Sequence, residues 1–84
     1  MTREEEYNGY VIMCDLYTVD RGTYIMKRKQ YIIMHEIPMS TIIKNGRMWH
    51  DDMLHSSTCV GYPVFRVLKD AKTFIDSGLK SQII

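Results

Sequence analysis

The segment from Gly61 to Gly78 constrains the fold of this chain more than any other stretch. It reads GYPVFRVLKDAKTFIDSG, and its apolar positions 68, 71, 74 and 75 recur at the spacing of one helix face. Gly78 stands where a helix commonly ends, because a helix C-terminus often needs a residue in the left-handed conformation. The pattern predicts a short strand at 62–66 that leads into an amphipathic helix over 67–78.

The size and composition of the chain predict a single domain that spans residues 1–84. Hydrophobic residues make up 45% and charged residues 25%, which is typical of a soluble globular protein. Residues 7–66 are mainly β-like, whereas the acidic residues 1–6 are typical of a flexible tail. We therefore predict an α+β fold in which one C-terminal α-helix backs a small antiparallel β-sheet of four or five strands.

The alternation of side chains predicts two long strands before residue 38. Residues Tyr10–Val19 are largely apolar on both faces, as expected of a strand inside a sheet. Residues 20–22, Asp-Arg-Gly, fit a three-residue hairpin loop in which Gly22 supplies a positive φ. Residues 23–37 are predicted to form one long, bent strand, because their Lys-Arg-Lys-Gln stretch lacks turn-forming residues, and Pro38 would end it.

The dipeptide Asn45-Gly46 gives the strongest local turn signal. It lies between STIIK and RMWH, which predicts a hairpin with a type I′ turn. Pairing outward from that turn places Lys44 opposite Arg47 and Ile42 opposite Trp49. Pro63 predicts that the following strand lies at an edge of the sheet, because proline cannot donate to a strand ladder.

The segment VFRVLKDAKTFID resembles a strand-to-helix ending, F-x-S/T-L-K-E-A-K-x-x-I-D, of small phage and mobile-element proteins. A related arrangement occurs in the arm-site DNA-binding domains of phage integrases, where a helix backs a three-stranded sheet. Val67 departs from the pattern, because Ser or Thr would cap the helix there. The resemblance implies a phage or mobile-element origin. It is carried by Phe65, Leu68, Lys69, Asp70, Ala71, Lys72, Ile75 and Asp76.

Cysteine usage and hydropathy predict the compartment. Cys14 and Cys59 are far apart in sequence and match no disulfide pattern, which favours free thiols in a reducing cytosol. The longest unbroken apolar run, Tyr31–Met34, is far too short to cross a membrane. We therefore expect a cytoplasmic protein of a bacterium or of a phage-infected host, without membrane association.

The polar stretch 50–59 contains the residue types of a metal or catalytic site. His50 or His55 could act as a general base, oriented by Asp51 or Asp52. The spacing H-x4-H-x3-C matches no compact zinc motif, and the chain has no nucleophile elbow or phosphate-binding glycine loop. We expect no enzyme and no cofactor, although the sequence leaves metal binding open. A zinc site would draw on His50, His55 and Cys59, with Cys14 or Asp51.

A basic, aromatic sheet face is one binding hypothesis. Cations contact phosphates and aromatic rings stack on bases in many nucleic-acid-binding sheets. Strand alternation limits the idea, because it places Lys27 and Lys29 on the face opposite to Arg28. Nucleic-acid binding, on DNA or RNA, is therefore the alternative function. The residues concerned are Lys27, Arg28, Lys29, Lys44 and Arg47, with Tyr24, Tyr31 and Trp49.

Protein binding is the favoured hypothesis. A single helix cannot cover both faces of the sheet, so one face with tyrosine and methionine side chains should remain open to a partner protein or a homodimer. The expected protein is a small, non-enzymatic phage or mobile-element accessory factor that inhibits or modulates a host or defence protein complex. Its predicted partner-binding residues are the anchors Tyr17, Tyr24, Met26 and Trp49 and the polar rim Lys27, Arg28, Lys29 and Arg47.

Overall fold

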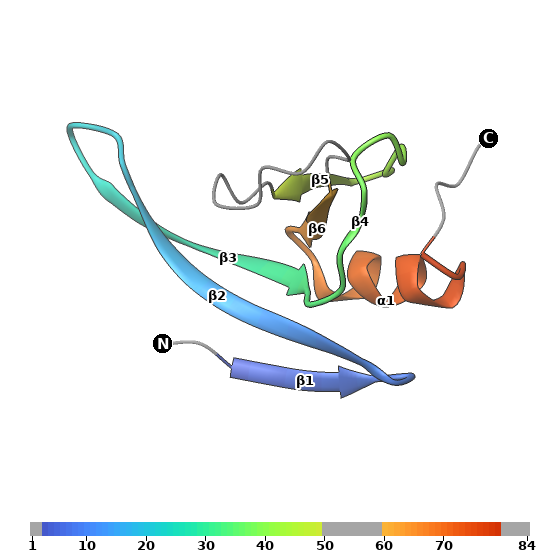
Figure 1. Ribbon diagram of the computed structural model, residues 1–84. Coiled ribbons are helices and arrows are strands. Elements are labelled where there is room, and N and C mark those ends of the chain that lie inside the picture. The colour runs from blue at the N-terminus through green and yellow to red at the C-terminus, as the bar shows by residue number, and fades with distance from the viewer. Residues whose placement is uncertain (1–2, 50–59, 80–84) are drawn as a thin grey trace.

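The computed structural model describes residues 3–49 and 60–79 (Figure 1). All strand pairs are antiparallel, which confirms the α+β fold with an antiparallel sheet and a C-terminal helix. The described residues form a sheet of six strands, slightly more than predicted. The elements are β1 (Arg3–Tyr7), β2 (Tyr10–Asp20), β3 (Ile25–Ile33), β4 (Ile37–Pro38), β5 (Gly46–Trp49), β6 (Val60–Phe65) and α1 (Leu68–Asp76).

The first strand corrects an expectation. Residues 3–6 do not form a tail within the described chain but belong to β1, which pairs with β2 from Arg3 opposite Cys14 to Tyr7 opposite Tyr10. Asn8 and Gly9 join the two strands with φ angles of 49° and 84°. Asn-Gly is favoured in such tight hairpin turns because both residues tolerate positive φ. The acidic segment is therefore an edge strand.

The second hairpin is long, and its loop differs from the prediction. Residues 21–24 join β2 to β3, so β3 begins at Ile25, two residues later than expected. Gly22 has the expected positive φ of 86°, and its backbone N–H donates to Asp20 Oδ1 at 2.8 Å. The predicted strand over 23–37 is divided, because the chain bends after Ile33 before β4 begins.

Strand β5 does not form the predicted hairpin. Asn45 has a positive φ of 60°, but β5 pairs with β6, with Gly46 opposite Phe65 and Trp49 opposite Tyr62. Strand β6 also pairs with β3 and β4, so Pro63 lies inside the sheet and is buried, contrary to the edge prediction. The sheet accommodates this proline between the segment of β6 that pairs with β3 and the one that pairs with β4.

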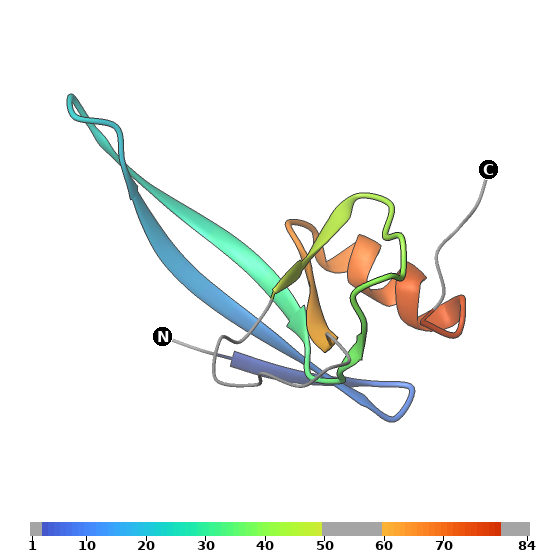
Figure 2. The same cartoon turned by 45° about the horizontal axis from the view of Figure 1, so that its top comes forward.

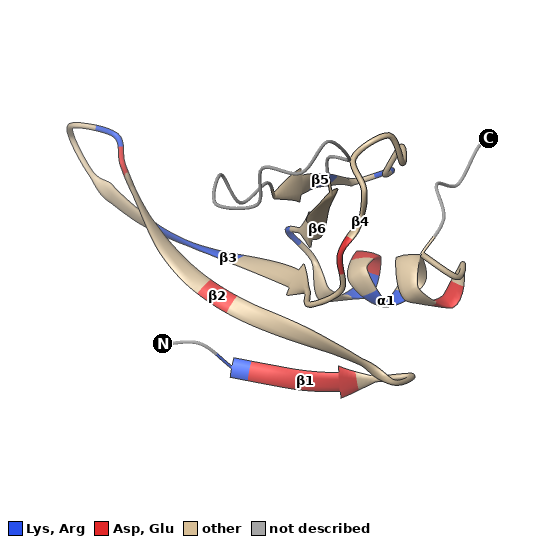
Figure 3. Cartoon of the chain, in the orientation of Figure 1, with Lys and Arg blue, Asp and Glu red and all other residues tan. Residues whose placement is uncertain are grey.

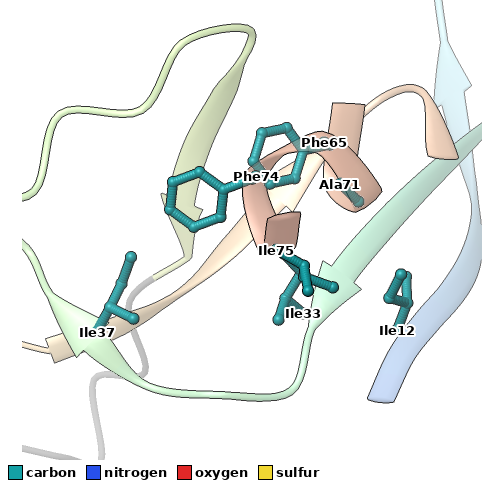
Figure 4. Packing of buried hydrophobic residues seen from close by; sticks show 7 residues of the cluster. All are labelled: Ile12, Ile33, Ile37, Phe65, Ala71, Phe74 and Ile75. Atoms are coloured by element: carbon teal, nitrogen blue, oxygen red, sulfur yellow. The ribbon is translucent and has the colours of Figure 1, made fainter. Parts of the chain in front are cut away.

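The hydrophobic core lies between one face of the sheet and α1 (Figure 4). Burial of these apolar side chains supplies most of the driving force for folding. The rings of Phe65 and Phe74 pack with centroids 5.5 Å apart. The buried cluster consists of Ile12, Ile33, Ile37, Phe65, Ala71, Phe74 and Ile75.

The ends of α1 follow the sequence pattern. Val67 occupies the N-cap position and makes no side-chain capping hydrogen bond. Gly78 has a φ of 79°, and its N–H donates to the carbonyl of Ile75 at 3.0 Å, which confirms the predicted glycine stop. Near the same end, the Tyr7 hydroxyl donates to Asp76 Oδ2 at 2.9 Å, so the first hairpin is tied to the helix.

The β2–β3 hairpin extends well beyond the rest of the sheet (Figures 1 and 2). Cys14 and Tyr31 are paired with each other, and beside them β1 begins at Arg3 and β6 ends at Phe65. From that pair outward, residues 15–30 form a two-stranded projection closed by the loop at 21–24. This projection is hereafter called the ribbon.

Candidate functional site: the open face of the sheet

The face of the sheet that lies opposite α1 gathers most of the predicted partner-binding residues. Side chains alternate along a strand, so the neighbours of core residues Ile12, Ile33 and Phe65 point away from the helix. We call this surface the open face, since in residues 3–49 and 60–79 the only helix packs on the other side. It carries the predicted residues Tyr17, Met26, Arg28, Arg47 and Trp49, together with Asp15, Val19, Gln30, Tyr62 and Val64.

The ribbon supplies an apolar and cationic part of the open face. Tyr17 lies opposite Arg28, and Val19 lies opposite Met26. All four side chains are half-buried although α1 packs on the other side of the sheet, because cross-strand neighbours shield one another. Arg28 Nη2 lies 3.8 Å from the sulfur of Met26. An aromatic ring, a methionine and an arginine are therefore presented as one cluster.

A row of hydrogen-bonded polar side chains crosses the base of the ribbon. Gln30 Nε2 donates to Asp15 Oδ2 at 3.0 Å, and Arg47 Nη2 donates to Gln30 Oε1 at 3.1 Å. These contacts join β2, β3 and β5. A groove of about 540 Å³ opens beside them and is also lined by Tyr17 and Arg66. These hydrogen bonds fix the amide of Gln30 and orient the guanidinium of Arg47 toward the ribbon.

An aromatic pair marks the end of the open face on β5. Trp49 stacks on Tyr62 with ring centroids 5.6 Å apart and an interplanar angle of 28°. The Tyr62 hydroxyl donates to Glu36 Oε1 at 3.0 Å. Trp49 remains 47% exposed, so much of the indole is available for contact. Tyr62 was not among the predicted residues, because its position opposite Trp49 depends on the pairing of β5 with β6.

Three of the predicted binding residues lie away from the open face. Lys27 and Lys29 are exposed on the other side of the ribbon, opposite Thr18 and Leu16, as strand alternation required. Tyr24 lies in the loop at the ribbon tip and is 57% exposed. The basic run, blue on β3 in Figure 3, therefore carries its charges on both faces of that strand.

Tyr31 does not belong to an exposed basic face. Its side chain packs against the core and lines a pocket with Cys14, whose thiol is free. Burial is the main cause that raises the pKa of the Tyr31 hydroxyl, and the neighbouring Cys14 adds to the effect. Lys44 lies in the turn before β5 rather than opposite Arg47. The basic aromatic set is therefore dispersed over the fold.

The candidate zinc and catalytic residues fall outside the described residues. This applies to His50, His55 and Cys59 and to the aspartates at 51 and 52. Within residues 3–49 and 60–79, no group of three His, Cys, Asp or Glu side chains is placed to hold a metal ion. No helix in the same part of the chain is long and apolar enough to cross a membrane.

No family model matches this chain, and comparisons with curated proteins and with solved structures found no match. The function is therefore inferred from the geometry of the open face and of the ribbon. The combination found there is a sheet surface that α1 does not cover, with an arginine–aromatic–methionine cluster at one end and a stacked tryptophan at the other. Such a surface can bind a macromolecule by burying its apolar side chains in an interface and by contacts from its arginines.

Proposed function

We propose that this protein is a non-enzymatic binding protein whose open face contacts a partner protein. The observation that carries the proposal is the concentration of Tyr17, Met26, Arg28, Arg47 and Trp49 on one sheet face that α1 does not cover. Aromatic, methionine and arginine side chains are enriched in protein interfaces, and exposed apolar patches commonly mark them.

The two ends of the open face would have different roles in this interface. The exposed indole of Trp49 and the ring of Tyr17 supply rigid apolar area, which makes them the expected anchors. Arg28 and Arg47 would supply the polar rim, with directional donors for carboxylates or carbonyls of the partner. Lys27, Lys29 and Tyr24 lie beside this surface on the ribbon and would contact only a partner that wraps around it.

The proposed mechanism is steric, without turnover. A bound partner would lose access to the surface that the open face covers, or would be held in an altered assembly. We extend the proposal to a phage or mobile-element factor that acts on a host or defence protein complex in the bacterial cytoplasm. Only the resemblance of the C-terminal segment supports this extension.

Affinity capture with matched variants tests the proposal. Tagged protein is incubated with a bacterial lysate, and captured proteins are compared for the natural chain, for Trp49→Ala and for Lys69→Ala. Lys69 is exposed on the helix, outside the open face, so its variant is the control. We expect one retained protein that Trp49→Ala loses and Lys69→Ala keeps. Equal capture by all three chains would contradict the assignment of the site.

Nucleic-acid binding is a second candidate, and the ribbon favours it. The major groove of B-DNA admits a two-stranded β-ribbon, and here Lys27, Arg28 and Lys29 follow one another along one strand of such a ribbon. Titration against random duplex and single-stranded DNA at two salt concentrations separates the candidates. Affinity that falls log-linearly with salt would support nucleic acid, whereas absence of binding at low salt would leave the protein partner.

A further inference from the structure

The outer edge of β1 is an acidic strand edge. Its sequence is REEEY, and in the described part of the chain it pairs with β2 alone. Glu4, Glu5 and Glu6 are all exposed, and Figure 3 shows most of the strand coloured for acidic residues. Glu5 lies on the helix side, where its carboxylate is 3.4 Å from Lys72 Nζ, while Glu4 and Glu6 lie on the open face.

The outer edge of β3 in the ribbon is basic. Strand β3 pairs with β6 only at Tyr31 and Ile32, so residues 25–30 pair with β2 and with no other described strand. Lys27 and Lys29 lie on the helix side of this segment, and Arg28 lies on the open face. An edge of this kind offers backbone N–H and C=O groups to another strand.

The two edges are complementary in length and charge. Strand β1 has five residues, and the basic segment of β3 has six. Each edge carries charges on both faces of the sheet. Carboxylates therefore meet cations whether the open face of one copy continues the open face or the helix side of the other. The three glutamates are consecutive in β1 and the three cations are consecutive in β3. The two runs therefore attract each other in a parallel or an antiparallel arrangement. Charged groups on adjacent strands lie within the Debye length of about 8 Å at physiological salt.

We propose that the acidic edge β1 of one copy of this chain pairs with the basic ribbon edge of β3 in a second copy. The contact would give the ribbon a third strand, and a two-stranded hairpin alone is only marginally stable in water. Two β1 edges would repel each other through their glutamates, and two β3 edges through their cations. The charges therefore also select the pairing of β1 with β3.

This association does not depend on the proposed function, since it uses strand edges and leaves the open face available. It joins two different surfaces, so it is a head-to-tail contact rather than a two-fold symmetric one. After the first contact forms, the joined pair still has one unused edge of each kind, a basic edge on one copy and an acidic edge on the other. Mass should therefore rise with concentration beyond that of one chain.

Charge-reversal variants mixed in pairs test the proposal. Light scattering or analytical ultracentrifugation follows the mass of purified, nucleic-acid-free protein against concentration. One variant is Glu4→Lys/Glu6→Lys, which retains the Glu5–Lys72 contact, and the other is Lys27→Glu/Lys29→Glu. All four side chains are exposed, and circular dichroism confirms that each variant folds. Partner capture from a lysate is measured separately, so that failure of one proposal is not failure of the other.

We expect the natural chain to reach about twice the monomer mass or more as concentration rises, and to dissociate at 1 M salt, where the Debye length is about 3 Å. Each variant alone should remain monomeric, and an equimolar mixture of the two should associate again, because one supplies the acidic edge and the other the basic edge. A natural chain that stays monomeric, or folded variants that associate alone as well as it does, would overturn the proposal.

Discussion

Tyr17 and Arg28 lie directly opposite each other on β2 and β3, on the face of the ribbon that α1 does not cover. Neither residue belongs to the hydrophobic core, although both are half-buried by their strand neighbours. They lie outside the buried cluster beneath α1, and Tyr17 also lines the groove beside Arg47 and Arg66. This separation allows binding and folding to be tested with different substitutions.

Substitutions on the ribbon should affect binding more than folding. We expect Tyr24→Ala and Arg28→Ala to change the free energy of unfolding by about 0.5 kcal/mol or less, as for most surface sites. Phe65→Ala, in the buried cluster, should cost about 3–5 kcal/mol. Urea denaturation measures both, and capture of the partner should be weakened by Arg28→Ala. Unfolding of the ribbon variants would show instead that these residues are structural.

Gly46 is expected to be intolerant of any side chain. A Cβ atom at this position would lie 2.5 Å from Cε1 of the buried Phe65 ring and 2.8 Å from Cγ2 of Ile43. Gly46→Ala should therefore destabilise the fold by about 1–3 kcal/mol, the usual cost of overpacking. Ile42→Ala, at a nearby side chain that is 72% exposed, is the control. Equal midpoints in urea for the two variants would contradict the close packing of β5 on β6.

The contact between Tyr7 and Asp76 predicts a pH dependence. The hydrogen bond to the Asp76 carboxylate is the main cause that raises the pKa of the Tyr7 hydroxyl above its ordinary value of 10.0. A raised pKa in the folded state gives stability that is complete below pH 10 and lost as the pH rises through the folded value. Tyr7→Phe should lower stability at neutral pH and make the alkaline loss shallower.

Chemical denaturation between pH 7 and about 11.5 measures this difference. Tyr24→Phe removes a hydroxyl at the ribbon tip, far from Asp76, and serves as the control for loss of a tyrosine. The free energy of unfolding of Tyr24→Phe should match that of the natural chain at every pH. That of Tyr7→Phe should lie below it at neutral pH and approach it only at high pH. Parallel curves for Tyr7→Phe and the natural chain would argue against the hydrogen bond.

Hydrogen exchange should separate the ribbon from the body of the sheet. Amides of Lys27 and Arg28 belong to a ladder with one neighbouring strand, whereas Ile33 is buried under α1. Regions with few buried contacts open at lower free energy, so the ribbon amides should exchange faster in dilute protein. Uniform exchange along β3 would indicate that the ribbon is as stable as the core and needs no further strand.

The helix was the most predictable element, because its signals are local. The amphipathic spacing around Ala71, Phe74 and Ile75 predicted which face is buried, and Gly78 predicted the end. The helix begins at Leu68 and ends at Asp76, within the predicted range of 67–78. Such signals need no knowledge of what the rest of the chain does.

Two Asn-Gly dipeptides show where local signals fail. Asn8-Gly9 forms a tight hairpin turn, although the acidic composition of the residues before it predicts a flexible tail. Asn45-Gly46 was expected to form such a hairpin, yet Gly46 begins a strand that pairs with β6. The choice depends on which strand is available to bury the segment, and that information is distant in sequence.

The candidate site was predictable only in part for the same reason. Strand alternation correctly placed Lys27 and Lys29 on the face opposite to Arg28. The stacking of Trp49 on Tyr62 and the hydrogen bond from Arg47 to Gln30 require the strand order of the sheet. Periodicity gives the face of a residue within its own strand, but it does not give the neighbouring strand.

Site-specific photo-crosslinking tests whether the open face binds a partner protein. A photoreactive phenylalanine derivative replaces Tyr17 on the open face or, as the control, Lys69 on the helix. Both proteins are irradiated in a bacterial lysate. We predict a discrete adduct with one other protein from position 17, removed by excess natural chain, and none from position 69. No adduct from position 17, or the same adducts from both positions, would contradict the claim.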